Sequence, residues 1–121
     1  MNKQQLVTRR QAIKLKQLGF HDKTCAYTCE NAQDSIIRLG MAWDYNKRVI
    51  NAATGKKGKP FISIPTVYEA FDWLVKRVKG HYFEIAWLEE QKYIAKNKYV
   101  RYRKAINMLI EAYEKDQNQY S

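Results

Sequence analysis

The sequence predicts an α+β domain: three helices with a small, mainly antiparallel sheet, in the order α-β-β-(β)-α-β-β-α. Three segments carry apolar residues at helical spacing, and two of them begin with a capping box. The stretches between the helices are short, rich in β-branched and aromatic residues, and separated by turn residues. With 121 residues, the chain is predicted to form a single compact domain over 1–121.

The first helix is predicted over residues 8–18. Thr8 and Gln11 fit a capping box, in which each side chain bonds the backbone N–H of the other residue. The apolar stripe that follows consists of Ala12, Leu15 and Leu18. Gly19 then supplies a left-handed stop, and Phe20 can fold back onto the stripe, as in a Schellman ending.

The next part of the chain is predicted to be extended. The candidate strands are TCAYT (24–28), SIIRLGMAW (35–43) and KRVINA (47–52). Residues 44–46 form a plausible turn between the last two candidates, and TGKKGKP (54–60) is a basic loop by composition. The following FISIP segment (61–65) is predicted to be extended up to its proline.

A second helix is predicted to begin at Thr66, which forms a capping box with Glu69, and to end at Gly80. The segments HYFEIAWL (81–88) and QKYIA (91–95) are typical of a β-hairpin. A last helix is predicted over about residues 98–115.

The charge of the chain is strongly basic, with 22 Lys and Arg against 12 Asp and Glu, a net charge of +10. Residues 1–60 carry +8 of this excess and residues 61–121 carry +2. Such a charge favours a nucleic acid or an acidic protein as partner, without identifying either. No apolar run is long enough to span a membrane, and no signal peptide is apparent, so we expect a cytoplasmic protein.

Residues 95–109, AKNKYVRYRKAINML, combine cations with tyrosines, as nucleic-acid-binding surfaces do. A helical projection puts Tyr99 and Tyr102 on the side of the apolar residues. The cations on the opposite side are Arg101, Arg103 and Lys104. Because single-strand binders display their rings along the basic groove, no stacking platform is predicted here. The three cations are either a polyanion site or the solvated face of an amphipathic helix.

Lys56, Lys57 and Lys59 are the lysines that we expect to touch a phosphate backbone, if the protein binds one. The motif GKKG (55–58) has the form of the GXXG loop with which KH domains clamp nucleotides. However, an extended segment follows where a KH domain needs a helix, and the spacing of a P-loop is absent. The alternative is a solvated basic loop without a ligand.

No metal, cofactor or catalytic site is predicted. Cys25 and Cys29 are too far apart in an extended strand for a disulfide, so reduced and partly buried cysteines are expected. Together with His21 and His81 they could form a Cys2His2 zinc set, but the spacing fits no standard finger. No carboxylate pair, phosphate loop or nucleophile elbow is present, so we expect no enzymatic activity.

Trp73 lies off the apolar stripe of the second predicted helix, which leaves two interpretations. Another segment of the chain, such as the sheet edge or the first helix, covers the indole ring. Alternatively, the ring anchors a protein interface, as exposed tryptophans commonly do.

Three phrases, QAIKLKQLGF (11–20), CAY (25–27) and ISIPTVYEAFDWL (62–74), occur in this order along the chain. Together they resemble a group of small proteins encoded by phages, prophages and mobile elements of gut bacteria. This sequence departs from the group at Ile64, where a small residue is usual, and in its 54–60 loop. The resemblance implies a genomic setting, but it assigns no activity and no binding residue.

Two functions remain open at this point. The first is a non-enzymatic accessory or interaction protein of a phage or prophage, with a protein partner, in the host cytoplasm or associated with the virion. The second is a nucleic-acid-binding module that uses the basic surface. The oligomeric state is not predicted by either function.

Overall fold

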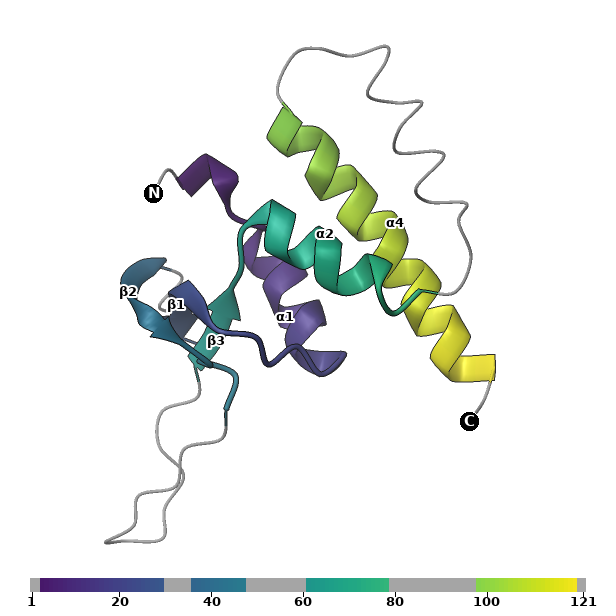
Figure 1. Ribbon diagram of the computed structural model, residues 1–121, viewed down its shortest axis with the longest axis horizontal. Helices are drawn as coiled ribbons and strands as arrows, with labels where there is room; N and C mark the ends of the chain where they lie inside the picture. The colour runs from purple at the N-terminus through teal and green to yellow at the C-terminus, as the bar shows by residue number, and fades with distance from the viewer. Residues whose placement is uncertain (1–2, 30–35, 48–60, 79–97, 120–121) are drawn as a thin grey trace, which may run out of the picture. The chain divides into compact units, whose positions relative to one another are not determined.

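Three α-helices and a three-stranded antiparallel sheet form the part of the chain that this computed structural model describes, residues 3–29, 36–47, 61–78 and 98–119 (Figure 1). This confirms the predicted α+β class. The chain divides into two units, which are described separately. We call residues 8–65 the sheet unit, and residues 1–7 together with 66–121 the helical unit. The single domain over 1–121 stays a prediction.

Each unit contains its own regular elements. The sheet unit holds α1 (Arg9–Gln17), β1 (Thr24–Cys29), β2 (Arg38–Trp43) and β3 (Phe61–Ile64). The helical unit holds a short 3-10 helix (Lys3–Gln5), α2 (Val67–Val75) and α4 (Lys98–Gln119).

Helix α1 has the predicted ends. The Thr8 hydroxyl accepts a hydrogen bond from the Gln11 backbone N–H, and the Gln11 side chain accepts one from the Thr8 N–H, both at 3.1 Å. Gly19 has a φ of +96°, the left-handed conformation that a glycine adopts without strain. The Phe20 N–H donates to the Leu15 carbonyl, which completes the Schellman motif.

The sheet has the strand order β2-β1-β3, and both pairings are antiparallel. Along β1, buried residues alternate with half-exposed ones, which is the pattern of a strand with one covered side. Ala26 and Thr28 lie opposite Ile64 and Ile62 of β3 on the buried side. The register between β1 and β2 is irregular between Thr24 and Ala26, as at a β-bulge.

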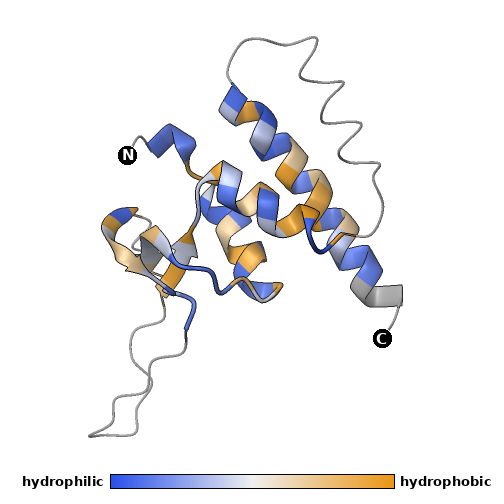
Figure 2. Cartoon of the chain, in the orientation of Figure 1, coloured by the Kyte–Doolittle hydropathy of each residue, from blue (hydrophilic) through white to orange (hydrophobic). Residues whose placement is uncertain are grey.

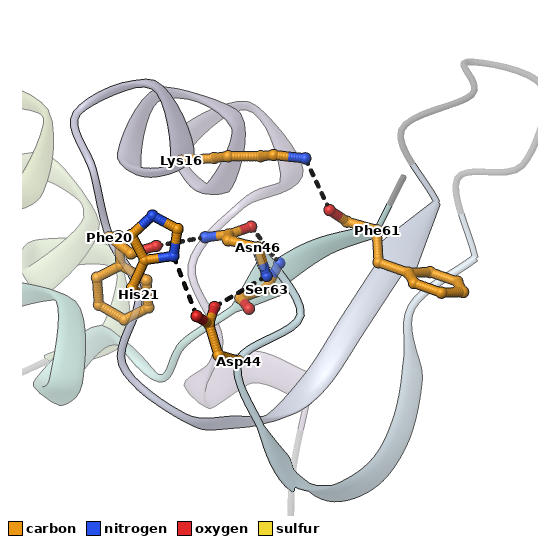
Figure 3. Close-up of polar contacts among 7 residues, drawn as sticks. All are labelled: Lys16, Phe20, His21, Asp44, Asn46, Phe61 and Ser63. Carbon is orange, nitrogen blue, oxygen red and sulfur yellow. Dashed lines mark hydrogen bonds and ion pairs between the residues drawn. The ribbon is translucent and has the colours of Figure 1, made fainter. Parts of the chain in front are cut away.

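The outer edge of β3 is covered within the sheet unit (Figure 3). The Lys16 ammonium of α1 donates to the Phe61 carbonyl at 2.9 Å. The Asn46 side-chain oxygen accepts from the Ser63 N–H at 2.9 Å, while its NH₂ group donates to the Phe20 carbonyl at 2.8 Å. Asn46 therefore connects the end of α1 to β3, and helix α1 packs against this strand.

The helical unit is formed by α2 and α4, which pack against each other. Thr66 caps α2 through the predicted exchange with Glu69. Figure 2 shows hydrophobic residues in the middle of α4, alongside α2, and hydrophilic residues toward its ends. The buried apolar residues of this unit are Leu6, Val7, Val67, Ala70, Trp73, Leu74, Val78, Ala105, Ile106, Leu109 and Ile110.

Helices α2 and α4 differ from their predicted lengths. Helix α2 ends at Val75, before the predicted stop at Gly80. The Arg77 guanidinium donates to the Trp73 carbonyl at 3.0 Å, so that a side chain takes up a carbonyl at the helix end. Helix α4 continues four residues beyond its predicted end, to Gln119.

Several predicted features lie outside the described residues. They are most of the candidate strand at 47–52, the basic loop at 54–60 and the hairpin at 81–95. These remain predictions.

The two hydrogen bonds of Asn46 lead to a stability prediction. Asn46 is 6% exposed, so its loss leaves the Ser63 N–H and the Phe20 carbonyl buried without their partner. We expect Asn46→Ala to lower the free energy of unfolding by about 2–4 kcal/mol, measured by urea denaturation. Gln17→Ala, on the exposed side of α1, is the control and is expected to change it by less than about 0.5 kcal/mol. Equal midpoints for the two variants would contradict this role.

Candidate functional site

Trp73 is buried, with 4% of its surface exposed. Its ring lies 6.0 Å from the ring of Tyr113 of α4, and the Arg77 guanidinium stacks over it at 4.0 Å. Within the helical unit, Tyr113 of α4 and Arg77 lie against the ring. With only 4% of its surface exposed, the Trp73 side chain offers almost no contact area to a partner protein in this conformation.

The three cations predicted to share the polar face of α4 have different environments. Arg101 is 5% exposed, because the buried arc of α4 is wide enough to include it beside Ala105. The Arg103 guanidinium donates to the carbonyls of Leu6 and Gln4, and so holds the N-terminal segment against α4. Of these three, only Lys104 is exposed. The structure therefore does not bring them together as a phosphate-binding face.

Tyr99 and Tyr102 pack against α2 side chains, on the side that the helical projection predicts. The Tyr102 ring lies 4.7 Å from Tyr68 and 5.4 Å from Phe71, in edge-to-face contacts. Burial raises the pKa of the Tyr102 hydroxyl, and the neighbouring Tyr68 and Asp72 raise it further. The Tyr99 hydroxyl accepts a hydrogen bond from Gln5. These rings are thus used for packing within the helical unit.

Lys56, Lys57 and Lys59 lie outside the described residues, so their contact with a phosphate backbone stays a prediction. Cys25 and Cys29 are half-buried on β1, and neither forms a disulfide. The His21 ring bonds the Asp44 carboxylate at 3.0 Å, as drawn in Figure 3. In the described part of the chain, no three His, Cys, Asp or Glu side chains come together as a metal site.

Among the described residues, the largest group of exposed apolar side chains lies on and beside β2. All six residues of this strand are exposed. We call the following four residues the edge site: Ile36, Leu39, Met41 and Trp43, which are 61%, 51%, 85% and 38% exposed. Among the described residues only three further large apolar side chains are exposed, and all three belong to the helical unit. An exposed apolar strand of this kind indicates a binding surface.

The two edge strands of the sheet, β3 and β2, differ in how their outer backbone groups are covered. At β3, Lys16 and Asn46 bond outward-facing backbone groups. At β2, the strand pairs on one side with β1, and no further strand of the described ranges lies beyond it. Natural proteins usually protect an edge strand with charged side chains, prolines or a covering segment. In β2, the only charged residue is Arg38, at its beginning.

Aromatic packing holds β2 against β1. Tyr45, in the turn after β2, stacks on Tyr27 of β1 with ring centroids 4.3 Å apart. Its hydroxyl donates to the Met41 carbonyl at 2.7 Å. Burial raises the pKa of this hydroxyl, with smaller contributions from Tyr27 and Cys25, so it stays protonated as the donor. Gly40 makes room for the stack, because a Cβ there would lie 2.8 Å from the Tyr45 oxygen.

The sheet unit also carries most of the net positive charge. Residues 8–65 contain eleven Lys and Arg and four Asp and Glu, an excess of +7, whereas the helical unit has an excess of +3. The edge site therefore lies in the more basic of the two units.

The edge site was not found by sequence reasoning, although SIIRLGMAW was correctly predicted to contain a strand. Its apolar residues do not alternate regularly with polar ones, so the pattern does not tell which side of the strand is covered. Whether a strand lies at an edge depends on pairing with distant segments, which a local pattern does not contain.

Comparison of the chain with protein-family models, with curated proteins and with solved structures gives no match. No helix in the described part of the chain is long and apolar enough to cross a membrane. The assignment of a function therefore depends on the edge site and on the charge around it.

The close fit at Gly40 can be tested by a double-mutant cycle. We expect Gly40→Ala to lower the free energy of unfolding by about 1–2 kcal/mol, because the new methyl group displaces the Tyr45 ring. In a Tyr45→Ala background the same change is expected to be neutral or stabilising, since alanine suits a strand better than glycine. Urea denaturation of the four proteins measures the coupling, and simple additivity would show that the stack does not depend on Gly40.

Proposed function

We propose that the chain is a non-enzymatic interaction protein, which binds an extended segment of a partner protein along the open edge of β2. The observation that carries this proposal is the edge site, an edge strand with four large apolar side chains exposed on or beside it. In strand addition, main-chain hydrogen bonds supply affinity, and alternate side chains supply specificity. A β2 edge with apolar residues offers both.

The charge of the sheet unit favours a partner segment with acidic residues. An excess of +7 attracts such a segment and speeds its association. The same charge disfavours a second copy of this chain at the edge, because two equally basic units repel each other. The affinity of the partner is therefore expected to fall as salt is added.

The resemblance to proteins of phages, prophages and mobile elements supplies a setting for this activity. An accessory protein of such an element acts by contacting host or virion proteins, in the host cytoplasm or in the particle. A binding edge suits that role.

The first experiment uses the purified full-length chain as bait for a displayed library of random peptides of about ten residues, longer than a typical strand. We expect enriched peptides to combine alternating apolar residues with Asp or Glu. An enriched peptide is then labelled, and its affinity is measured by fluorescence anisotropy for two matched variants, Met41→Gln and Met108→Gln. Both methionines are exposed, but Met108 lies on α4.

Met41→Gln is expected to weaken peptide binding about tenfold, because burying a methionine side chain contributes about 1.5–3 kcal/mol. Met108→Gln is expected to leave the affinity unchanged. Strand addition leads to a second expectation, because only every other amide of the peptide donates to β2. N-methylation of these amides should abolish binding, whereas N-methylation of the amides between them should preserve it.

Failure of the library to enrich peptides, or equal binding by wild type and Met41→Gln, would overturn the proposal. Sedimentation across a concentration series gives a separate control. A dimer that Met41→Gln dissociates would assign the edge to a second copy of the chain instead.

A further inference from the structure

A second surface of the sheet unit carries aromatic rings on the half-exposed side of β1. The rings of Tyr27 and Tyr45 are stacked, and Phe61 of β3 meets Tyr27 edge-on at 5.4 Å. All three side chains are half-exposed, whereas Ala26 and Thr28, which point to the other side of β1, are buried. These rings therefore form part of the surface rather than the interior of the sheet.

Cations accompany these rings. Arg38 of β2 lies directly opposite Tyr27 in the sheet register, and directly opposed residues share one side of a sheet. Lys47 follows Tyr45 by two residues, and both cations are exposed. The acidic group nearest in sequence to Tyr45 is Asp44, whose two oxygens bond His21 and the Asn46 N–H. We call Tyr27, Arg38, Tyr45 and Phe61 the aromatic face.

We infer that the aromatic face binds single-stranded nucleic acid. Proteins that hold single strands without sequence preference combine a basic surface with aromatic side chains on which bases stack. In a duplex the bases are already stacked on one another, so rings of this kind select single strands. The cations contact phosphates, which position the strand without reading its sequence.

The combination of rings and cations distinguishes this ligand from an acidic peptide. The carboxylates of an acidic peptide interact only with the cations. A single-stranded nucleic acid places its phosphates on the cations and its unpaired bases on the rings. Of the three cations predicted to contact a polyanion on α4, Arg101 is buried and Arg103 bonds backbone carbonyls. The aromatic face shares no residue with the edge site, but the two surfaces adjoin: the Trp43 ring meets the Tyr45 ring edge-on at 5.3 Å.

The test measures binding of fluorescein-labelled oligothymidylate to the full-length chain by anisotropy, across a salt series. Two variants address the aromatic face, Phe61→Leu and Arg38→Gln. Two matched controls remove the same kinds of group from the helical unit, Tyr68→Leu and Lys104→Gln. Thermal unfolding of each variant confirms that it remains folded under the binding conditions.

We expect Phe61→Leu to weaken binding at least about fivefold, the lower end of what one lost base–ring stack removes. Arg38→Gln is expected to make the slope of log affinity against log salt shallower by about 0.7, the value for one phosphate contact on a single strand. The two controls are expected to bind as wild type does, and duplex DNA is expected to bind more weakly than the single strand.

Three results would overturn the inference. The first is no binding at about 10 µM protein in low salt, where even non-specific binders associate. The second is equal weakening by Arg38→Gln and Lys104→Gln with no effect of Phe61→Leu, which indicates charge attraction alone. The third is full competition by polyglutamate at equal charge, which assigns the face to acidic protein segments.

Discussion

The sheet unit depends on the side-chain amide of Asn46. This buried group donates to the Phe20 carbonyl at the end of α1 and accepts from the Ser63 N–H of β3. One residue in the turn after β2 thereby connects the helix, the turn and the far strand. Because both partners are backbone groups in a buried place, only a side chain with a donor and an acceptor at this position satisfies them. An alternative position of α1 relative to β3 breaks at least one of these two bonds.

This constraint also makes the sheet asymmetric. With Lys16, Asn46 bonds backbone groups of β3, so that edge is closed to further strands. The same turn carries Tyr45. Its ring stacks on Tyr27, and its hydroxyl donates a hydrogen bond to the Met41 carbonyl of β2. The result is a β2 strand that is fixed in position while its side chains remain exposed. A fixed edge loses less conformational freedom on binding than a flexible one, which favours β2 as a docking strand.

The accuracy of the sequence predictions follows the range of the interactions involved. The caps at Thr8 and Thr66 and the stop at Gly19 were predictable, because each depends on residues within three or four positions. Arg101 was predicted on the polar face of the last helix but is buried, because the width of the buried arc on α4 depends on what packs against it. The two hydrogen bonds of Asn46 join residues that are 17 and 26 positions apart, and the exposure of the β2 edge depends on which strands pair, so a local pattern holds no information on either.

The same reasoning explains why residue type was a poor guide to the site. Trp73, Arg101 and Arg103 are the residue types enriched in binding surfaces, yet the first two are buried and the third is bonded to carbonyls of its own chain. No role was predicted for Met41 or Gly40. Met41 is the most exposed large apolar residue among those described, and Gly40 makes space for the stack of Tyr27 and Tyr45. A side chain can contact a partner only if it is neither buried in the core nor bonded within its own chain. In the sheet unit, the fold leaves the edge of β2 and the aromatic face available.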